Sequence, residues 1–156
     1  SMFATYLEFI QNLSVEIARE IDLQWSDIID NLIHLGMAYL LALPMAYDRE
    51  RSHNGAGLRT FPFVAVASCG YALIAMSVLE GAGAQSKMLQ GIITGIGFIG
   101  GGAILKNNQS TSGTATAASI WNMGLIGIAI AYSRYEIAIL LAVINFITLR
   151  YVKKFK

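Results

Sequence analysis

Long apolar blocks alternate with short polar stretches along most of this chain. Each block is close to the roughly 20 residues that an α-helix needs to cross the hydrocarbon core of a bilayer. Because the connections are short, successive helices must be antiparallel neighbours. The pattern therefore predicts an all-α membrane protein, a compact bundle of about five transmembrane helices. The predicted spans are residues 28–47, 62–80, 88–105, 115–132 and 137–152.

The first 27 residues follow a different pattern. Over residues 3–23, apolar side chains recur at helical spacing and charged ones fall on the other side, which predicts an N-terminal amphipathic helix. Helices that lie on anionic lipid are usually basic, whereas this one is acidic, so packing against the bundle or a partner is favoured over the membrane surface. We divide the chain into the amphipathic helix and linker, residues 1–27, and the five-helix membrane domain, residues 28–156.

Composition agrees with a membrane protein and excludes other classes. Hydrophobic residues make up 55% of the chain and charged residues 13%, against about 25% charged residues in ordinary soluble domains. The net charge of +1 provides no basic field for nucleic acid. The single cysteine, Cys69, allows no disulfide framework within the chain.

The placement of positive charge predicts an orientation. If the first span reaches the cytoplasm near Asp48, eight Lys and Arg residues lie inside and three lie outside. The positive-inside rule favours this arrangement, with the N-terminus outside and the C-terminus cytoplasmic.

The third apolar block is rich in glycine. Residues 95–100 match the dinucleotide-binding pattern G-x-G-x-x-G, but that pattern needs a preceding strand in a soluble βαβ unit, so we reject it. Glycines four apart let helix backbones approach closely, and many glycines also weaken a helix. We favour tight packing over a broken helix that lines a polar cavity. The packing candidates are Gly91, Gly95, Gly97, Gly100, Gly101 and Gly102.

The polar loop expected at residues 48–61 holds several charges. In one interpretation they are solvated and set only the topology. In the other, Arg49, Glu50 and Arg59 turn inward and pair at the mouth of the bundle, because a half-buried arginine needs a carboxylate or carbonyl partner. The residues leave both alternatives open.

Polar side chains within the spans are expected to form hydrogen bonds between helices. They are Gln90, Thr94, Thr116, Ser119, Asn122 and Asn145. If Gln90, Thr94 and Asn122 converge, they form a small polar site. No carboxylate pair lies deep in the membrane, which argues against a proton pump or a magnesium site, and we expect no metal, no cofactor and no catalysis. The candidate functional cluster is Arg49, Glu50, Arg59, Thr60, Gln90, Thr94, Thr116 and Asn122.

Three stretches, covering about residues 32–150, resemble the signatures of the MgtC/SapB family in order and spacing. They are Asp48-Arg49-Glu50-Arg51 with Ala56-Gly57-Leu58-Arg59-Thr60, Gln90 to Leu105, and Thr114 to Trp121 followed by Gly127. The resemblance implies a five-span domain of the bacterial inner membrane, linked to magnesium limitation, acid stress and virulence. Phe61 departs from the pattern, since a histidine often stands there. We expect the membrane domain only, without the soluble C-terminal domain of some members.

Two functions are considered. The leading hypothesis is a non-enzymatic protein that binds and modulates partner membrane proteins, with a homo-oligomer formed through the glycine-rich helix. The resemblance implies the ATP synthase as one such partner. The alternative is a small ion or solute transporter or channel, with a polar cavity around Gln90, Arg59 and Asn122 beside a broken third helix. The lipid bilayer surrounds the protein in both cases, and neither involves nucleic acid.

Overall fold

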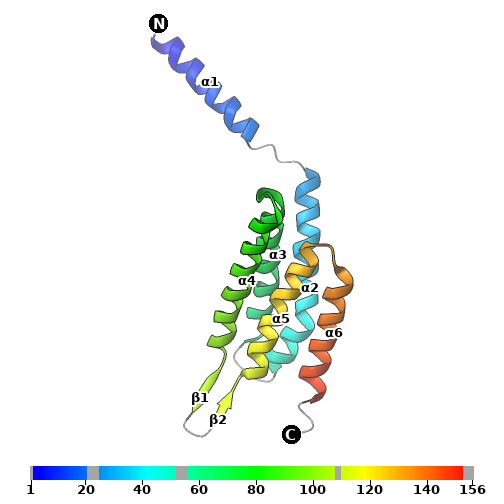
Figure 1. The fold of residues 1–156 in the computed structure, drawn as a ribbon. Coiled ribbons are helices and arrows are strands. Elements are labelled where there is room, and N and C mark those ends of the chain that lie inside the picture. Colours follow the sequence, from blue (N-terminus) through cyan, green and yellow to red (C-terminus); the bar gives the residue numbers. More distant parts are fainter. Residues whose placement is uncertain (1, 21–24, 52–55, 108–109, 153–156) are drawn as a thin grey trace. The chain divides into compact units, whose positions relative to one another are not determined.

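The computed structural model describes residues 2–20, 25–51, 56–107 and 110–152. Residues 1–31 and 32–156 form two compact units, and each is described by itself. Six helices and one β-hairpin are found in the described residues (Figure 1). The helices are α1 (Met2–Glu20), α2 (Trp25–Arg51), α3 (Thr60–Val78), α4 (Ala82–Gly102), α5 (Thr114–Ala131) and α6 (Tyr135–Tyr151), and the hairpin consists of β1 (Leu105–Asn107) and β2 (Ser110–Ser112).

Helix α1 is the amphipathic helix predicted for residues 3–23. Its apolar side chains, among them Phe3, Tyr6 and Ile10, are exposed. The end of the predicted range, from residue 21 on, lies outside the described residues. Whether this helix packs against a protein or lies on the membrane stays a prediction.

The second unit is a helical bundle built around α5. Helix α5 contacts α3, α4 and α6, and α3 also contacts α4. These helices run antiparallel to their neighbours in the chain (Figure 1). The amphipathic helix and the five further helices together confirm the all-α fold class.

Glycines on α5 allow close contacts with α3 and α4. A Cβ atom added to Gly127 would collide with the carbonyl oxygen of Ala65, and one added to Gly124 would collide with the side chain of Ile96 on α4. At Gly127 glycine is required, because the colliding atoms belong to the backbone of α3. At Gly124 the colliding atom is the end of a flexible side chain, which can move more easily. We predicted close packing at the glycines of the third span, whereas the structure shows it at these two glycines of the fourth and, in the third, at Gly100.

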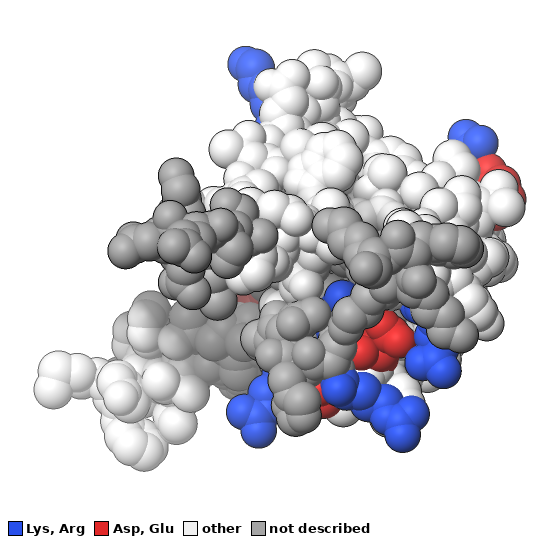
Figure 2. All heavy atoms as spheres, turned by 90° about the horizontal axis from the view of Figure 1, so that it is seen from below, with Lys and Arg blue, Asp and Glu red and all other residues white. Residues whose placement is uncertain are grey.

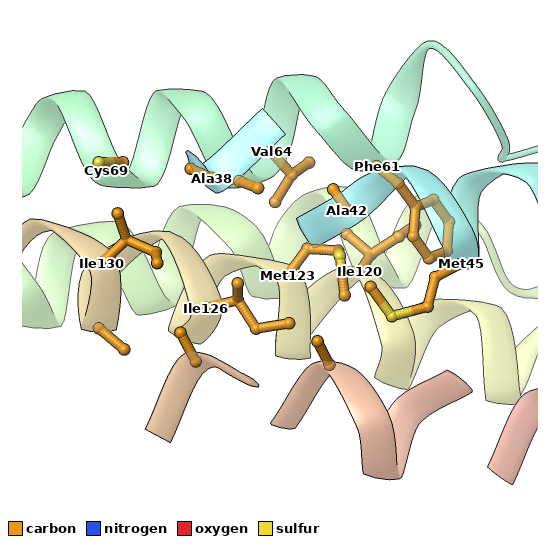
Figure 3. Packing of buried hydrophobic residues seen from close by; sticks show 14 of the residues in the cluster. Ala38, Ala42, Met45, Phe61, Val64, Cys69, Ile120, Met123, Ile126 and Ile130 are labelled. Atoms are coloured by element: carbon orange, nitrogen blue, oxygen red, sulfur yellow. The ribbon is translucent and has the colours of Figure 1, made fainter. Parts of the chain in front are cut away.

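Larger side chains from α2, α3 and α5 also pack together in the core. Figure 3 shows Ile120 and Met123 of α5 near Met45 of α2 and Phe61 of α3. All four side chains are almost fully buried. Helix α2 thus joins the core through its second half, where small residues such as Ala42 alternate with larger ones.

The bounds predicted for the loop at residues 48–61 are wrong at both ends. Helix α2 continues through Asp48 to Arg51, and α3 begins at Thr60. Pro62 lies in the first turn of α3, where its missing N–H removes no helical hydrogen bond. The extra turn of α2 is held by side-chain contacts to α6, which local sequence does not reveal. Residues 52–55 of this loop lie outside the described residues.

The predicted loop at residues 106–113 contains a hairpin instead. Strands β1 and β2 pair antiparallel, with Leu105 opposite Ser112. The pairing satisfies backbone groups that a loop would leave to water. Gly113 ends the hairpin with φ of 85°, and a Cβ atom there would collide with the carbonyl oxygen of Ala103. Glycine is therefore required for the sharp entry into α5.

The outer surface of the bundle is apolar. Large side chains such as Leu40, Phe63, Phe98 and Leu140 are at least 61% exposed. A patch this apolar on a soluble protein would drive aggregation, but a bilayer accommodates it. Three helices, α2, α3 and α5, are long and apolar enough to cross a membrane by length and composition. For α4, with its glycines and Lys87, and for the 17-residue α6, a full crossing stays a prediction.

Replacing Gly127 by alanine should destabilise the bundle. The new methyl group must push α5 away from the backbone of α3, and overpacking of this kind costs about 1–3 kcal/mol. Unfolding of the purified protein in detergent, followed by circular dichroism, measures this. The matched control is Gly101→Ala on α4, whose added methyl group would meet nothing within 4 Å. Equal stability of the two variants would show that the α5 backbone does not lie against α3 at Gly127.

Candidate functional site

A charged cluster joins α2 to α6 at one end of the bundle. The Arg49 guanidinium donates to Asp48 Oδ2 at 2.7 Å and to the carbonyl oxygen of Leu149 at 3.4 Å. Arg150 of α6 donates to Asp48 Oδ1 at 3.4 Å. The Arg49 side chain is only 5% exposed and that of Asp48 12%. A charge this buried needs its partners, so this cluster holds the ends of α2 and α6 together.

The segment that follows α2 is anchored to the same helix end. Glu50 accepts the backbone N–H of Leu58 at 3.0 Å. Gly57 makes this approach possible, since a Cβ atom there would collide with the Glu50 carboxylate. Arg59, which follows Leu58 in the chain, is exposed. It is held near the end of α2 because Leu58 is bonded to Glu50 there. Thr60 is half-buried at the start of α3.

The two interpretations of this loop are therefore each right for part of it. Arg49 turns inward and pairs, whereas Arg59 remains exposed. Glu50 is exposed but bonded to the backbone. Figure 2 views this end of the molecule and shows Lys and Arg side chains around a central group of Asp and Glu.

Asp48, Leu149 and Arg150 were not among the candidate residues. The available signal was an arginine near the end of the last span, which the predicted topology places on the same side of the membrane as the end of the first span. Sequence does not reveal that these two ends meet, because they lie about a hundred residues apart.

A buried polar pair joins α5 to α6. Ser119 lies within hydrogen-bond distance of Asn145 Oδ1, at 3.1 Å, and of the Ala115 carbonyl oxygen, at 2.8 Å. This confirms the predicted helix-to-helix hydrogen bonding for these two residues. Thr116, one turn earlier on α5, is also buried.

The sequence left open whether Gln90, Thr94 and Asn122 converge on a small polar site. Gln90 and Thr94 are exposed on α4, and the Thr94 hydroxyl donates to the Gln90 carbonyl oxygen at 2.8 Å. In the described part of the chain, no hydrogen bond joins either residue to Asn122, which is half-buried on α5. Among the described residues, the hydrogen bonds therefore do not join these three side chains into one polar site.

The glycine-rich helix α4 is continuous through Gly102, so the structure does not show the predicted alternative of a broken helix. Of the six predicted packing glycines, Gly100 packs within the bundle, where a Cβ atom would lie 3.1 Å from the Ala117 carbonyl oxygen. An added Cβ atom at any of the other five would meet nothing within 4 Å, so close packing within the bundle is wrong for them. We call these five residues the open glycine face: Gly91, Gly95, Gly97, Gly101 and Gly102.

A groove of about 350 Å³ lies beside this face, between α3 and α4. Gly91 and Gly95 line one side, and Ala67 and Tyr71 of α3 line the other. Ser68, also in the lining, donates its hydroxyl to the Val64 carbonyl oxygen and leaves the groove almost wholly apolar. The groove suits an apolar helix or chain.

No group of three or more His, Cys, Asp and Glu side chains that could hold a metal ion is found in the described residues.

Comparison with known proteins identifies the family. The sequence pattern of the MgtC family matches residues 35–156. The chain is 31% identical over 125 residues to the Escherichia coli K12 protein named "Putative magnesium transporter YhiD", a match that covers 76% of this chain and 58% of that protein. It is also 31% identical to Brucella abortus "Protein MgtC" over 67% of this chain and 43% of that one.

A third relative is Bacillus subtilis "Protein SapB", 31% identical over 73% of this chain and 53% of that protein. The chain thus spans about half the length of these curated relatives. No solved structure matches it. The matches confirm the resemblance that the three sequence signatures indicated.

Replacing Asp48 by asparagine should weaken the bundle. The change removes the carboxylate that faces Arg49 and Arg150, and breaking a buried ion pair from one side costs about 3 kcal/mol. Denaturant unfolding in detergent measures the loss. The control is Glu136→Gln, which removes a carboxylate paired with Arg134 at 2.6 Å on the exposed surface. Stability should then stay close to wild type. An Asp48→Asn variant as stable as this control would show that the cluster does not hold the helix ends.

Proposed function

The chain belongs to the MgtC family, and we propose that it is a non-enzymatic protein of the bacterial inner membrane that acts in magnesium homeostasis by binding partner membrane proteins. The name of its Escherichia coli relative, a putative magnesium transporter, supports the link to magnesium. We place the N-terminus outside and the C-terminus in the cytoplasm, because arginines gather at the end of the bundle where α2 ends and α3 begins.

The open glycine face of α4 carries this proposal. Glycine in a helix costs roughly 1 kcal/mol relative to alanine, and within the bundle these five glycines make no close contact that would offset the cost. In a bilayer, small residues stabilise the association of two helices because they let the backbones approach closely. The stabilisation comes from van der Waals packing and Cα–H contacts. An outward-facing glycine surface is therefore suited to a helix from another chain.

The groove beside this face defines what such a helix would contact. It would lie against Gly91 and Gly95 and pack its side chains toward Ala67 and Tyr71. Since the lining is apolar, the fit selects an apolar membrane helix with small residues of its own. A second copy of this chain meets that description through its own α4, and family resemblance implies a subunit of the ATP synthase as a further candidate.

Substituting Gly91 and Gly95 by leucine should weaken partner binding without unfolding the protein. The leucine side chains would fill the groove and hold another helix away, while nothing in the bundle lies within 4 Å of the new Cβ atoms. Recovery of other membrane proteins by affinity purification from native membranes should fall about tenfold, equivalent to about 1.4 kcal/mol. Quantitative mass spectrometry of the recovered proteins makes the measurement.

The matched control is Gly36→Leu on α2, since Gly36 also has nothing within 4 Å of its added Cβ atom but lies away from the groove. This variant should recover partners as the wild type does. Equal recovery by all three proteins would contradict the proposal, and so would a wild-type preparation that contains only this chain as a monomer.

The alternative, a transporter, has the name of the Escherichia coli relative in its favour. Magnesium uptake into proteoliposomes containing the wild-type chain tests it directly. Protein-dependent flux that is lost in Arg59→Ala or Asn122→Ala would favour transport over partner binding. We expect no flux above that of empty liposomes.

A further inference from the structure

The charged end of the bundle carries an excess of positive charge whose distribution is uneven. Four arginines, Arg49, Arg51, Arg59 and Arg150, lie around the end of α2, together with two carboxylates, Asp48 and Glu50. Both carboxylates are bonded within the chain. Asp48 contacts Arg49 and Arg150, and Glu50 accepts the backbone N–H of Leu58.

The remaining positive charge faces outward. Arg51 and Arg59 are exposed, and among the described residues neither forms an ion pair. The Arg51 guanidinium lies 5.1 Å from the centre of the Tyr47 ring, which orients it by a cation–π contact. Arg59 is held near the same helix end by the bond between Leu58 and Glu50. We call Arg51 and Arg59 the arginine pair.

Apolar side chains border this arginine pair. Tyr47 is 53% exposed and Leu58 is 41% exposed. Tyr47 precedes Arg51 by one helical turn, and Leu58 precedes Arg59 directly. A soluble anion would gain nothing from contact with these apolar side chains. A phospholipid, in contrast, carries a phosphate that can bind the arginines and an acyl chain that can contact the apolar side chains.

The height of the arginine pair in the membrane agrees with this ligand. Arg51 is the last residue of α2 and Arg59 directly precedes α3, and both helices are long and apolar enough to cross a membrane. Residues at the ends of spanning helices lie at the level of the headgroups. Guanidinium groups bind phosphate with paired hydrogen bonds, which favours arginine for this task.

We propose that the arginine pair, Arg51 and Arg59, with Tyr47 and Leu58 beside it, is a binding site for the headgroup of an anionic phospholipid. The phosphate and the negatively charged headgroup bind the two guanidinium groups, and the acyl chain descends past Tyr47 and Leu58. The site is separate from the open glycine face and does not depend on the function proposed for it.

Native mass spectrometry of the full-length protein in detergent tests the proposal. The protein is titrated separately with phosphatidylglycerol and phosphatidylcholine, and the ratio of lipid-bound to lipid-free protein is compared. Each arginine near a membrane surface is worth about 1 kcal/mol toward anionic lipid, or about fivefold in binding. We expect wild-type protein to prefer phosphatidylglycerol by at least about fivefold.

The double variant Arg51→Gln/Arg59→Gln should bind the two lipids about equally. Its matched control is Lys87→Gln/Arg134→Gln, which removes the same charge from the opposite end of the bundle and should keep the preference. Both variants should unfold at the wild-type temperature, because neither touches the bonds of Asp48. A preference that survives in the Arg51→Gln/Arg59→Gln variant, or is absent from the wild type, would overturn the proposal. So would loss of the preference in millimolar inorganic phosphate but not in chloride of equal ionic strength, since the site would then bind free phosphate.

Discussion

The near-contact of the α5 and α3 backbones at Gly127 and Ala65 is the constraint on which the bundle depends. Lipid provides little hydrophobic force to hold helices together, so close packing must supply the stability. Once α5 lies against α3 in this way, Gly124 brings it close to Ile96 of α4 as well. These two residues without side chains thus help to place α5 at the centre of the bundle, in contact with α3, α4 and α6.

That central position explains how polar residues are divided between the interior and the surface. Ser119 lies on the side of α5 that faces α6, so its hydroxyl meets Asn145 there. Asp48 and Arg49 lie where α2 meets α6 and are shielded from solvent. Because Asp48 and Glu50 bond within the chain, Arg51 and Arg59 form no ion pair among the described residues. The chain thus presents positive charge at one end of the bundle.

Helix α4 differs from the other helices because much of its glycine content is not used within the bundle. Gly100 is packed against α5, while the open glycine face points away. Tyr71 and Ala67 of α3 form the facing wall of the groove. Two surfaces of different chemistry therefore face the membrane, an apolar groove along the helices and an arginine pair at their end, and each suits a different kind of ligand.

The sequence by itself determined the membrane class, the six helices with bounds correct to within a few residues at most ends, and the family, because hydrophobic length and local motifs are properties of neighbouring residues. It also identified Arg49 and Glu50 as candidates. Only the tertiary structure decided that Arg49 is buried while Arg59 is exposed, that Gln90 and Asn122 stay apart, and that Gly127, rather than Gly95, lies at a close helix contact. These outcomes depend on which helix faces are brought together by packing, and apolar spans with little amphipathic pattern do not show in sequence which face turns inward.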